Sequence, residues 1–175
     1  RSGLWETLQG CSSWLFINLL TAVLASVVIG LFEATIERLV ALAVLMPIVA
    51  SMGGNAGTQT MTVAVRAIAL RQLDATATRQ FVLRELIVAT TNGLLFAALA
   101  AALSYLWFGD PQIAIVMAVA MMANLVVAGM SGTFVPVGLM RAGVDPAVAS
   151  SVFVTTITDV VGFFVFLGLA ALYLM

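Results

Sequence analysis

Long stretches without charged residues are the feature that most limits what this chain can fold into. Each stretch reaches the roughly 20 residues that an α-helix needs to cross a bilayer. The stretches are 7–32, 39–65, 86–109, 111–140 and, interrupted only by Asp159, 146–175. Hydrophobic residues make up 63% of the chain and charged residues 9%, against about 25% charged residues in soluble domains. The pattern therefore predicts an integral membrane protein.

The connections between these stretches predict an all-α fold of five transmembrane helices. Turn-forming residues at 109–111 and 143–146 separate the last three stretches, and 66–85 is the extended polar segment. The predicted spans are 11–32, 38–68, 82–107, 112–138 and 147–173. The chain opens at Arg1 with no initiator Met or signal-peptide pattern, so we expect a piece of a longer protein.

The arginines predict how the helices cross the membrane. In a five-span zigzag, all the arginines except Arg38 fall at one end. They are Arg1, Arg66, Arg71, Arg79, Arg84 and Arg141. Because positive residues concentrate on the cytoplasmic side, we expect the N-terminus and the 66–85 segment to be cytoplasmic and the C-terminus to lie outside.

The composition also excludes several functions. A net charge of −1 provides no basic surface for nucleic acid, which we therefore exclude as a partner. With no His and a single Cys11, the chain has no ligand set for zinc, copper or an iron–sulfur cluster. Any metal ion must therefore be bound by oxygen atoms.

Asp159 is the residue least suited to lipid. It lies near the middle of the fifth predicted span, where an ionised carboxylate costs at least about 2.5–3.5 kcal/mol. Ser151 and Thr155 precede it and Gly162 follows it on the same helical face, so a polar stripe leads to the acid. The alternative is a protonated Asp that forms a hydrogen bond between packed helices and has no further function.

The second predicted span contains an unusually polar segment, Pro47–Thr62. On a helix, six of its residues share one face and form a second polar stripe. They are Pro47, Ser51, Gly54, Asn55, Thr58 and Thr62. The alternative is a packing seam of small residues that includes Gly53 and Gly57. Asn92 and Asn124 in the next two spans are interpreted as packing positions.

An oxygen-only site around one carboxylate suits a hard cation, and Mg²⁺, which keeps part of its water shell, fits best. A lone Asp supplies one negative charge, so we expect two copies of the chain to pair about a twofold axis and bring two Asp159 side chains to one pore. Composition and spacing alone do not separate Mg²⁺ from Ca²⁺, Mn²⁺ or a proton relay.

The run Gly53-Gly54-Asn55-Ala56-Gly57-Thr58-Gln59-Thr60, preceded by Met46-Pro47, resembles the transmembrane domain of the MgtE family of magnesium channels. The five-span layout and the element Thr158–Gly162 around the acid are also similar. The resemblance covers essentially the whole chain. It implies a homodimer of five-helix subunits in the lipid bilayer of the plasma (inner) membrane, with a pore lined mainly by the second and fifth helices.

The resemblance also implies roles for individual residues. Asp159 would hold a hydrated Mg²⁺, both transported and bound, with Thr155 beside it. Gly53, Gly54, Asn55 and Thr58 would line the pore or bind through oxygen atoms, and Gly162 would give space beside the acid. Residues 11–175 would form the pore domain, and residues 1–10 would be the end of a linker from cytoplasmic N and CBS domains that this sequence lacks.

Three other functions compete with passive Mg²⁺ permeation into the cytoplasm. A proton-coupled carrier would use the same acid, which would alternate between a proton and a cation. A structural subunit would need Asp159 only for packing. An intramembrane protease would need two apposed acids, whereas the spans contain one, so we predict that the chain is not an enzyme.

Overall fold

The computed structural model describes residues 3–38, 40–70, 75–143 and 146–173, and in these ranges all regular secondary structure is helical. The helices are α1 (Leu4–Leu31), α2 (Glu33–Arg38), α3 (Val40–Ala69), α4 (Ala75–Phe108), α5 (Pro111–Arg141) and α6 (Pro146–Tyr173). Five of them are long and apolar enough to cross a membrane. This result confirms the predicted all-α fold with five spans, whereas the short α2 was not expected.

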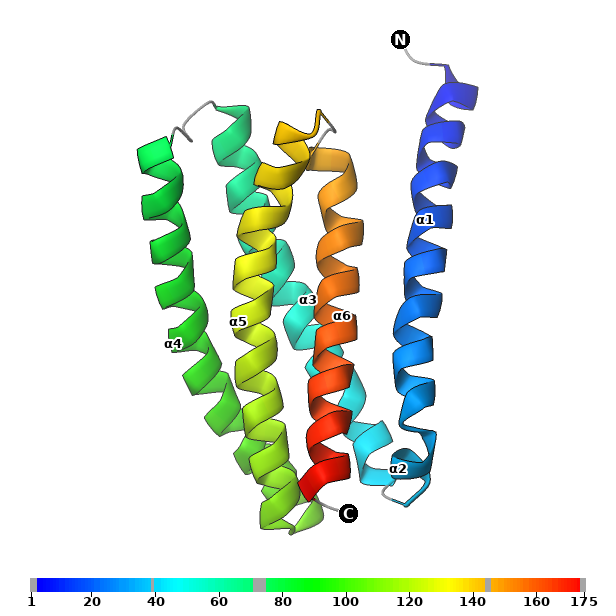
Figure 1. The fold of residues 1–175 in the computed structure, drawn as a ribbon, viewed down its shortest axis with the longest axis vertical. Coiled ribbons are helices and arrows are strands. Elements are labelled where there is room, and N and C mark those ends of the chain that lie inside the picture. The colour runs from blue at the N-terminus through cyan, green and yellow to red at the C-terminus, as the bar shows by residue number, and fades with distance from the viewer. Residues whose placement is uncertain (1–2, 39, 71–74, 144–145, 174–175) are drawn as a thin grey trace.

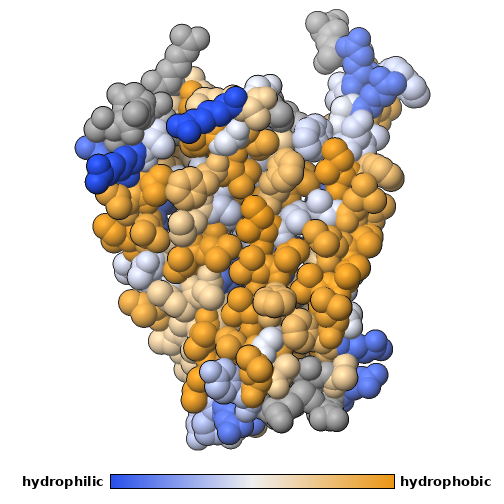
Figure 2. Space-filling view, viewed as in Figure 1, coloured by the Kyte–Doolittle hydropathy of each residue, from blue (hydrophilic) through white to orange (hydrophobic). Residues whose placement is uncertain are grey.

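The surface has the form expected for a multi-pass integral membrane protein. On the face shown in Figure 2, a broad hydrophobic belt crosses the middle of the molecule, and hydrophilic residues gather at its two ends. Large apolar side chains such as Leu15, Phe16 and Leu94 are exposed on this belt. In water such a surface would be unfavourable, but lipid solvates it.

Helices α3, α5 and α6 pack together at the centre of the molecule, and α4 packs against α5 (Figure 1). The centre is filled by side chains that are fully buried, including Leu42, Leu45, Met117 and Phe166. Helix α5 is the most buried of the five spans, whereas α1 is the least buried and contacts mainly α6. The outer helix α1 therefore stands beside a four-helix core.

Local sequence explains where the central helices begin and end. Gly109 has a φ of 69°, a conformation that favours glycine. Asp110 then caps α5 by accepting a 2.9 Å hydrogen bond from the Gln112 amide, and Pro111 occupies the first turn. At the other end of α5, Gly143 has a φ of 80°. The predicted break at 109–111 is confirmed.

The helices run alternately up and down between the two ends of the molecule, as the predicted five-span zigzag requires. The start of α1, the end of α3, the start of α4, the end of α5 and the start of α6 lie at one end, and α2 lies at the other with the end of α6 (Figure 1). Helix α3 continues through Pro47 and the glycine pair Gly53-Gly54. The whole polar segment predicted in the second span is therefore helical.

Candidate cation pathway on helices α3 and α6

Asp159 lies at the middle of α6. The helix runs from Pro146 to Tyr173, so the acid is about 20 Å from either end at a rise of 1.5 Å per residue. Its side chain is half-buried. The structure therefore places the carboxylate at the depth where lipid would solvate it least.

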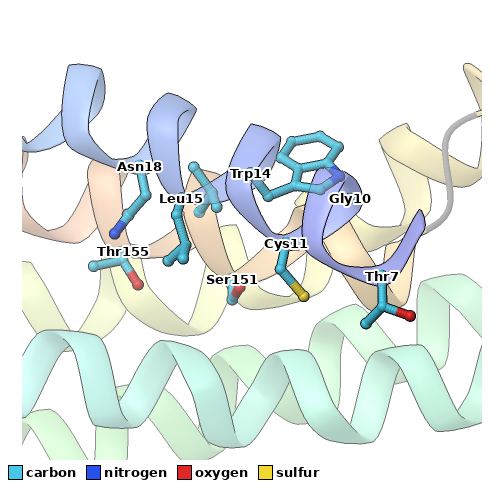
Figure 3. Close-up of a pocket in the computed structure, with 9 residues that line it drawn as sticks. Thr7, Gly10, Cys11, Trp14, Leu15, Asn18, Ser151 and Thr155 are labelled. Carbon is cyan, nitrogen blue, oxygen red and sulfur yellow. The ribbon is translucent and has the colours of Figure 1, made fainter. Parts of the chain in front are cut away.

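The polar face of α6 leads to this acid from the start of the helix, the end that the arginines predict to be cytoplasmic. Ser151 is exposed and Thr155 is half-buried, and both line a groove of about 660 Å³ between α1 and α6. Figure 3 shows them facing the side of α1 that carries Cys11 and Asn18. Gly162 does not share their exposure, because it is buried against α5.

The polar stripe of α3 lies on the outside of the single chain. Ser51, Asn55, Thr58 and Thr62 succeed one another by three or four residues, and all four are exposed. The Thr62 hydroxyl donates a 2.8 Å hydrogen bond to the Thr58 carbonyl, which satisfies it within the helix. Gly54 is half-buried, and a Cβ added there would meet no atom within 4 Å.

The opposite face of α3 is built from glycines that pack against other helices. Gly53 is buried directly under the Asn124 amide of α5, and a Cβ at Gly57 would lie 2.6 Å from Val154 Cγ1 of α6. Hydrophobic or polar side chains do not fit at these two positions without displacing a neighbour. Gly53 and Gly57 thus form the packing seam that the sequence offered as an alternative.

Asn124 connects the two stripe-bearing helices. It is completely buried, and its Nδ2 donates a 3.0 Å hydrogen bond to the Val49 carbonyl of α3. On the α6 side, a Cβ at Gly162 would lie 2.9 Å from the same nitrogen. The Asn124 Oδ1 is buried without a hydrogen-bond partner among the described residues. One amide therefore lies between α3 and α6 and is hydrogen-bonded to α3, with Gly53 and Gly162 providing its space.

The predicted site residues thus fall into two groups. Asn55 and Thr58 lie on the exposed stripe of α3, with Gly54 at its edge, and Thr155 and Asp159 lie on the half-buried face of α6. Gly53 and Gly162 are brought together on Asn124. The assignment of all seven to cation binding stays a prediction.

The part of the chain that the structure describes contains no cluster of three or more His, Cys, Asp or Glu residues. Hydroxyls, amides, carbonyls or water would therefore have to complete any metal site here.

Sequence reasoning assigned Asn124 a packing role but did not connect it to the two stripes. It also counted Glu85 in the polar segment 66–85 as well as at the start of the predicted span 82–107, and gave it no role, although Glu85 lies inside α4 and faces α3. The available signals were an amide in the middle of an apolar span, and an acid spaced seven residues from Asn92 on one helical face.

Comparison with known proteins shows the family of the chain. Residues 46–169, more than half of the chain, match the family model of MgtE, described as a divalent cation transporter. The chain belongs to the MgtE family. The match includes both polar stripes, Asn124 and Asp159, and confirms the resemblance predicted from the sequence.

Individual MgtE proteins match nearly the whole chain. It is 36% identical to the magnesium transporter MgtE of Thermus thermophilus and 30% identical to that of Bacillus subtilis, in each case over 161 residues, or 92% of the chain. The magnesium transporter MgtE of Enterococcus faecalis is 26% identical over the same length. The chain spans about a third, 36%, of the length of each relative.

Proposed function

We propose that the chain forms the membrane pathway of a Mg²⁺ transporter, in which the ion passes between two copies of the chain and Asp159 is the central cation site. The relatives at 30% and 36% identity are both named magnesium transporters. The helices that match them include the acid at the midpoint of α6.

The exposed stripe of α3 is the observation that carries this proposal. An amide and several hydroxyls, with Asn55 and Thr58 among them, lie on the outer surface of a helix that otherwise contacts lipid or protein. Polar groups in a bilayer are stable where they face protein or line a water-filled cavity. A second copy of the chain opposite this surface would supply both conditions.

The chemistry of the two stripes suits a partly hydrated Mg²⁺. Mg²⁺ keeps several of its waters and is held by one or two carboxylates. Pairing about a twofold axis would bring two Asp159 carboxylates to one path. Asn55, Thr58 and Thr155, with the backbone at Gly54, would hold the waters of the ion, while Gly53 and Gly162 would set the spacing of the two helices through Asn124.

The membrane potential supplies the driving force for this pathway. With the arginine-rich end in the cytoplasm, a divalent ion moving inward through 100 mV gains about 4.6 kcal/mol, twice the value for one elementary charge. No covalent step is needed. Asp159 then acts by attracting the ion and offsetting the loss of part of its hydration.

The test is Mg²⁺ uptake into liposomes that contain the purified chain, with an imposed potential. Asp159→Asn removes the charge and keeps the shape, so we expect uptake to fall at least about tenfold. Glu37→Gln is the matched control, because Glu37 is exposed at the end of the molecule that carries α2, and it should leave uptake unchanged.

Two results would contradict the proposal. Equal uptake by the wild type and Asp159→Asn, with folding and dimerisation preserved, would reduce the acid to a packing residue. Uptake that follows an imposed pH gradient and ignores the potential would replace the channel with a proton-coupled carrier at the same acid.

A further inference from the structure

A second polar pocket lies away from the Asp159 helix, among α3, α4 and α5. It has a volume of about 180 Å³, and its polar lining residues are Gln59, Thr60, Glu85 and Asn92. Among the described residues, α6 contributes none to its lining. On α3, Thr60 is half-buried and points away from the exposed stripe, because successive residues on a helix are separated by about 100°. Gln59 is exposed and lies at the edge of that stripe, about 40° from Asn55.

Small residues of α5 bring the two sides of this pocket together. A Cβ at Gly129 would lie 2.6 Å from the Ala89 Cβ of α4, and a Cβ at Gly132 would lie 2.9 Å from the Thr60 Cβ of α3. Helices α3 and α4 otherwise touch little and each packs on α5. The close approach of both helices to α5 therefore places Thr60 opposite Glu85.

The contact between these two residues is polar. The Thr60 hydroxyl lies 3.5 Å from Glu85 Oε2 and is oriented to donate to it. A carboxylate offers about four lone-pair positions. Among the described residues, Glu85 accepts this one long hydrogen bond, which leaves most of those positions available to another ligand. Gln59 and Asn92 add two amide oxygens at the exposed rim of the pocket.

The depth of the pocket gives it access to water. Glu85 is about 15 Å from the start of α4, and Thr60 is about 14 Å from the end of α3. Glu85 is also the last charged residue before the uncharged stretch 86–109. The pocket thus lies near the boundary of the apolar belt, toward the end of the molecule where α3 ends and α4 begins.

We propose that this pocket binds a partly hydrated divalent cation, at a site separate from Asp159. One carboxylate, one hydroxyl and two amide oxygens form an oxygen-only donor set, and several waters complete the shell. Mg²⁺ prefers this arrangement, because it retains water and is held by one or two carboxylates. The inference does not depend on the proposed transport, since it concerns equilibrium binding.

The experiment counts bound ions in the purified chain in lipid nanodiscs, using Mn²⁺ as a probe visible by electron paramagnetic resonance and Mg²⁺ as competitor. Glu85→Gln removes the charge of the pocket and should weaken one class of Mn²⁺ site by at least tenfold. Asp159→Asn should leave that class unchanged, and Glu37→Gln controls for nonspecific loss of an acid.

A gain-of-function variant keeps the test decisive if Glu85→Gln does not fold. Gln59→Glu adds a second carboxylate at the rim of the pocket and should tighten Mn²⁺ binding at least tenfold, with Mg²⁺ competing. If Glu85→Gln folds and binds Mn²⁺ as the wild type does, the proposal is overturned. If Glu85→Gln does not fold, unchanged Mn²⁺ binding in Gln59→Glu overturns it. In either case the pocket would be filled by water alone. Failure of the Asp159 proposal would appear only in the uptake measurements.

Discussion

The two faces of α3 use small and polar residues for opposite purposes. On one face, Gly53 and Gly57 are buried against Asn124 and Val154, so the absence of a side chain permits close packing. On the other, Ser51, Asn55 and Thr58 are exposed and make no packing contact that demands their size. The comparison teaches that one short sequence run can fix the helix packing on one side and place a polar surface on the other, and that mutations should separate the two.

The largest effect on stability is expected where an added side chain would meet the backbone of the packed face of α3. In Gly132→Ala, the new Cβ of α5 would lie 2.6 Å from the Gly57 carbonyl oxygen of α3. A helix backbone cannot move aside as a side chain can, so we expect the loss of about 3 kcal/mol of unfolding free energy, at the upper end for overpacking. Equilibrium unfolding of the purified chain in mixed micelles measures this loss of unfolding free energy.

Gly138→Ala is the matched control for this change. Gly138 belongs to the same helix, and its added Cβ would meet no atom within 4 Å. Alanine also has a higher helix propensity than glycine, so this variant should be neutral or stabilised by up to about 1 kcal/mol. Equal stability of the two alanine variants would mean that α3 and α5 are not packed as closely as described.

An intermediate effect is expected at Gly53. Its neighbour Asn124 is a side chain but is completely buried, so it can give way only partly. We expect Gly53→Ala to cost about 1–2 kcal/mol, whereas Gly54→Ala, one residue away in open space, should cost nothing. The same unfolding measurement compares this adjacent pair directly.

A double variant sharpens the result at Gly53. Asn124→Ala alone loses the hydrogen bond to the Val49 carbonyl and leaves a cavity, at a cost of about 1–2 kcal/mol. Combined with Gly53→Ala, it removes the atoms that the new methyl group displaces. The double variant should therefore lose about 1 kcal/mol less unfolding free energy than the two single variants lose together. Strict additivity would place the amide away from Gly53.

The smallest effect on stability is expected on the exposed face of α3. Asn55→Ala and Thr58→Ala remove no buried contact, so the unfolding free energy should change by less than about 0.5 kcal/mol. Under the proposed function, Mg²⁺ uptake should nevertheless fall several-fold, because these side chains hold the hydration shell of the ion. Unchanged uptake together with unchanged stability would remove α3 from the pathway.

Some features of the fold could be predicted because they depend only on neighbouring residues. The turn at 109–111 follows from a glycine, a capping acid and a proline in succession, and the structure has all three in those roles. The helix α2 was missed, because Glu33–Arg38 is too short to show a clear period and joins two apolar spans. Glu85 was missed because a charged residue at the edge of a span looks the same whether it faces water or a pocket.

The sequence by itself determined that the chain crosses a membrane five times, that it belongs with the MgtE proteins, and which residues share a helical face. These properties follow from the length of apolar runs and from the helical period. Only the tertiary structure decided which face of α3 packs, that Asn124 lies between Gly53 and Gly162, and that Thr60 meets Glu85. In a bilayer the packed and lipid-facing sides of a helix are both apolar, so hydrophobicity does not distinguish them, and the fit of small residues between helices settles the arrangement.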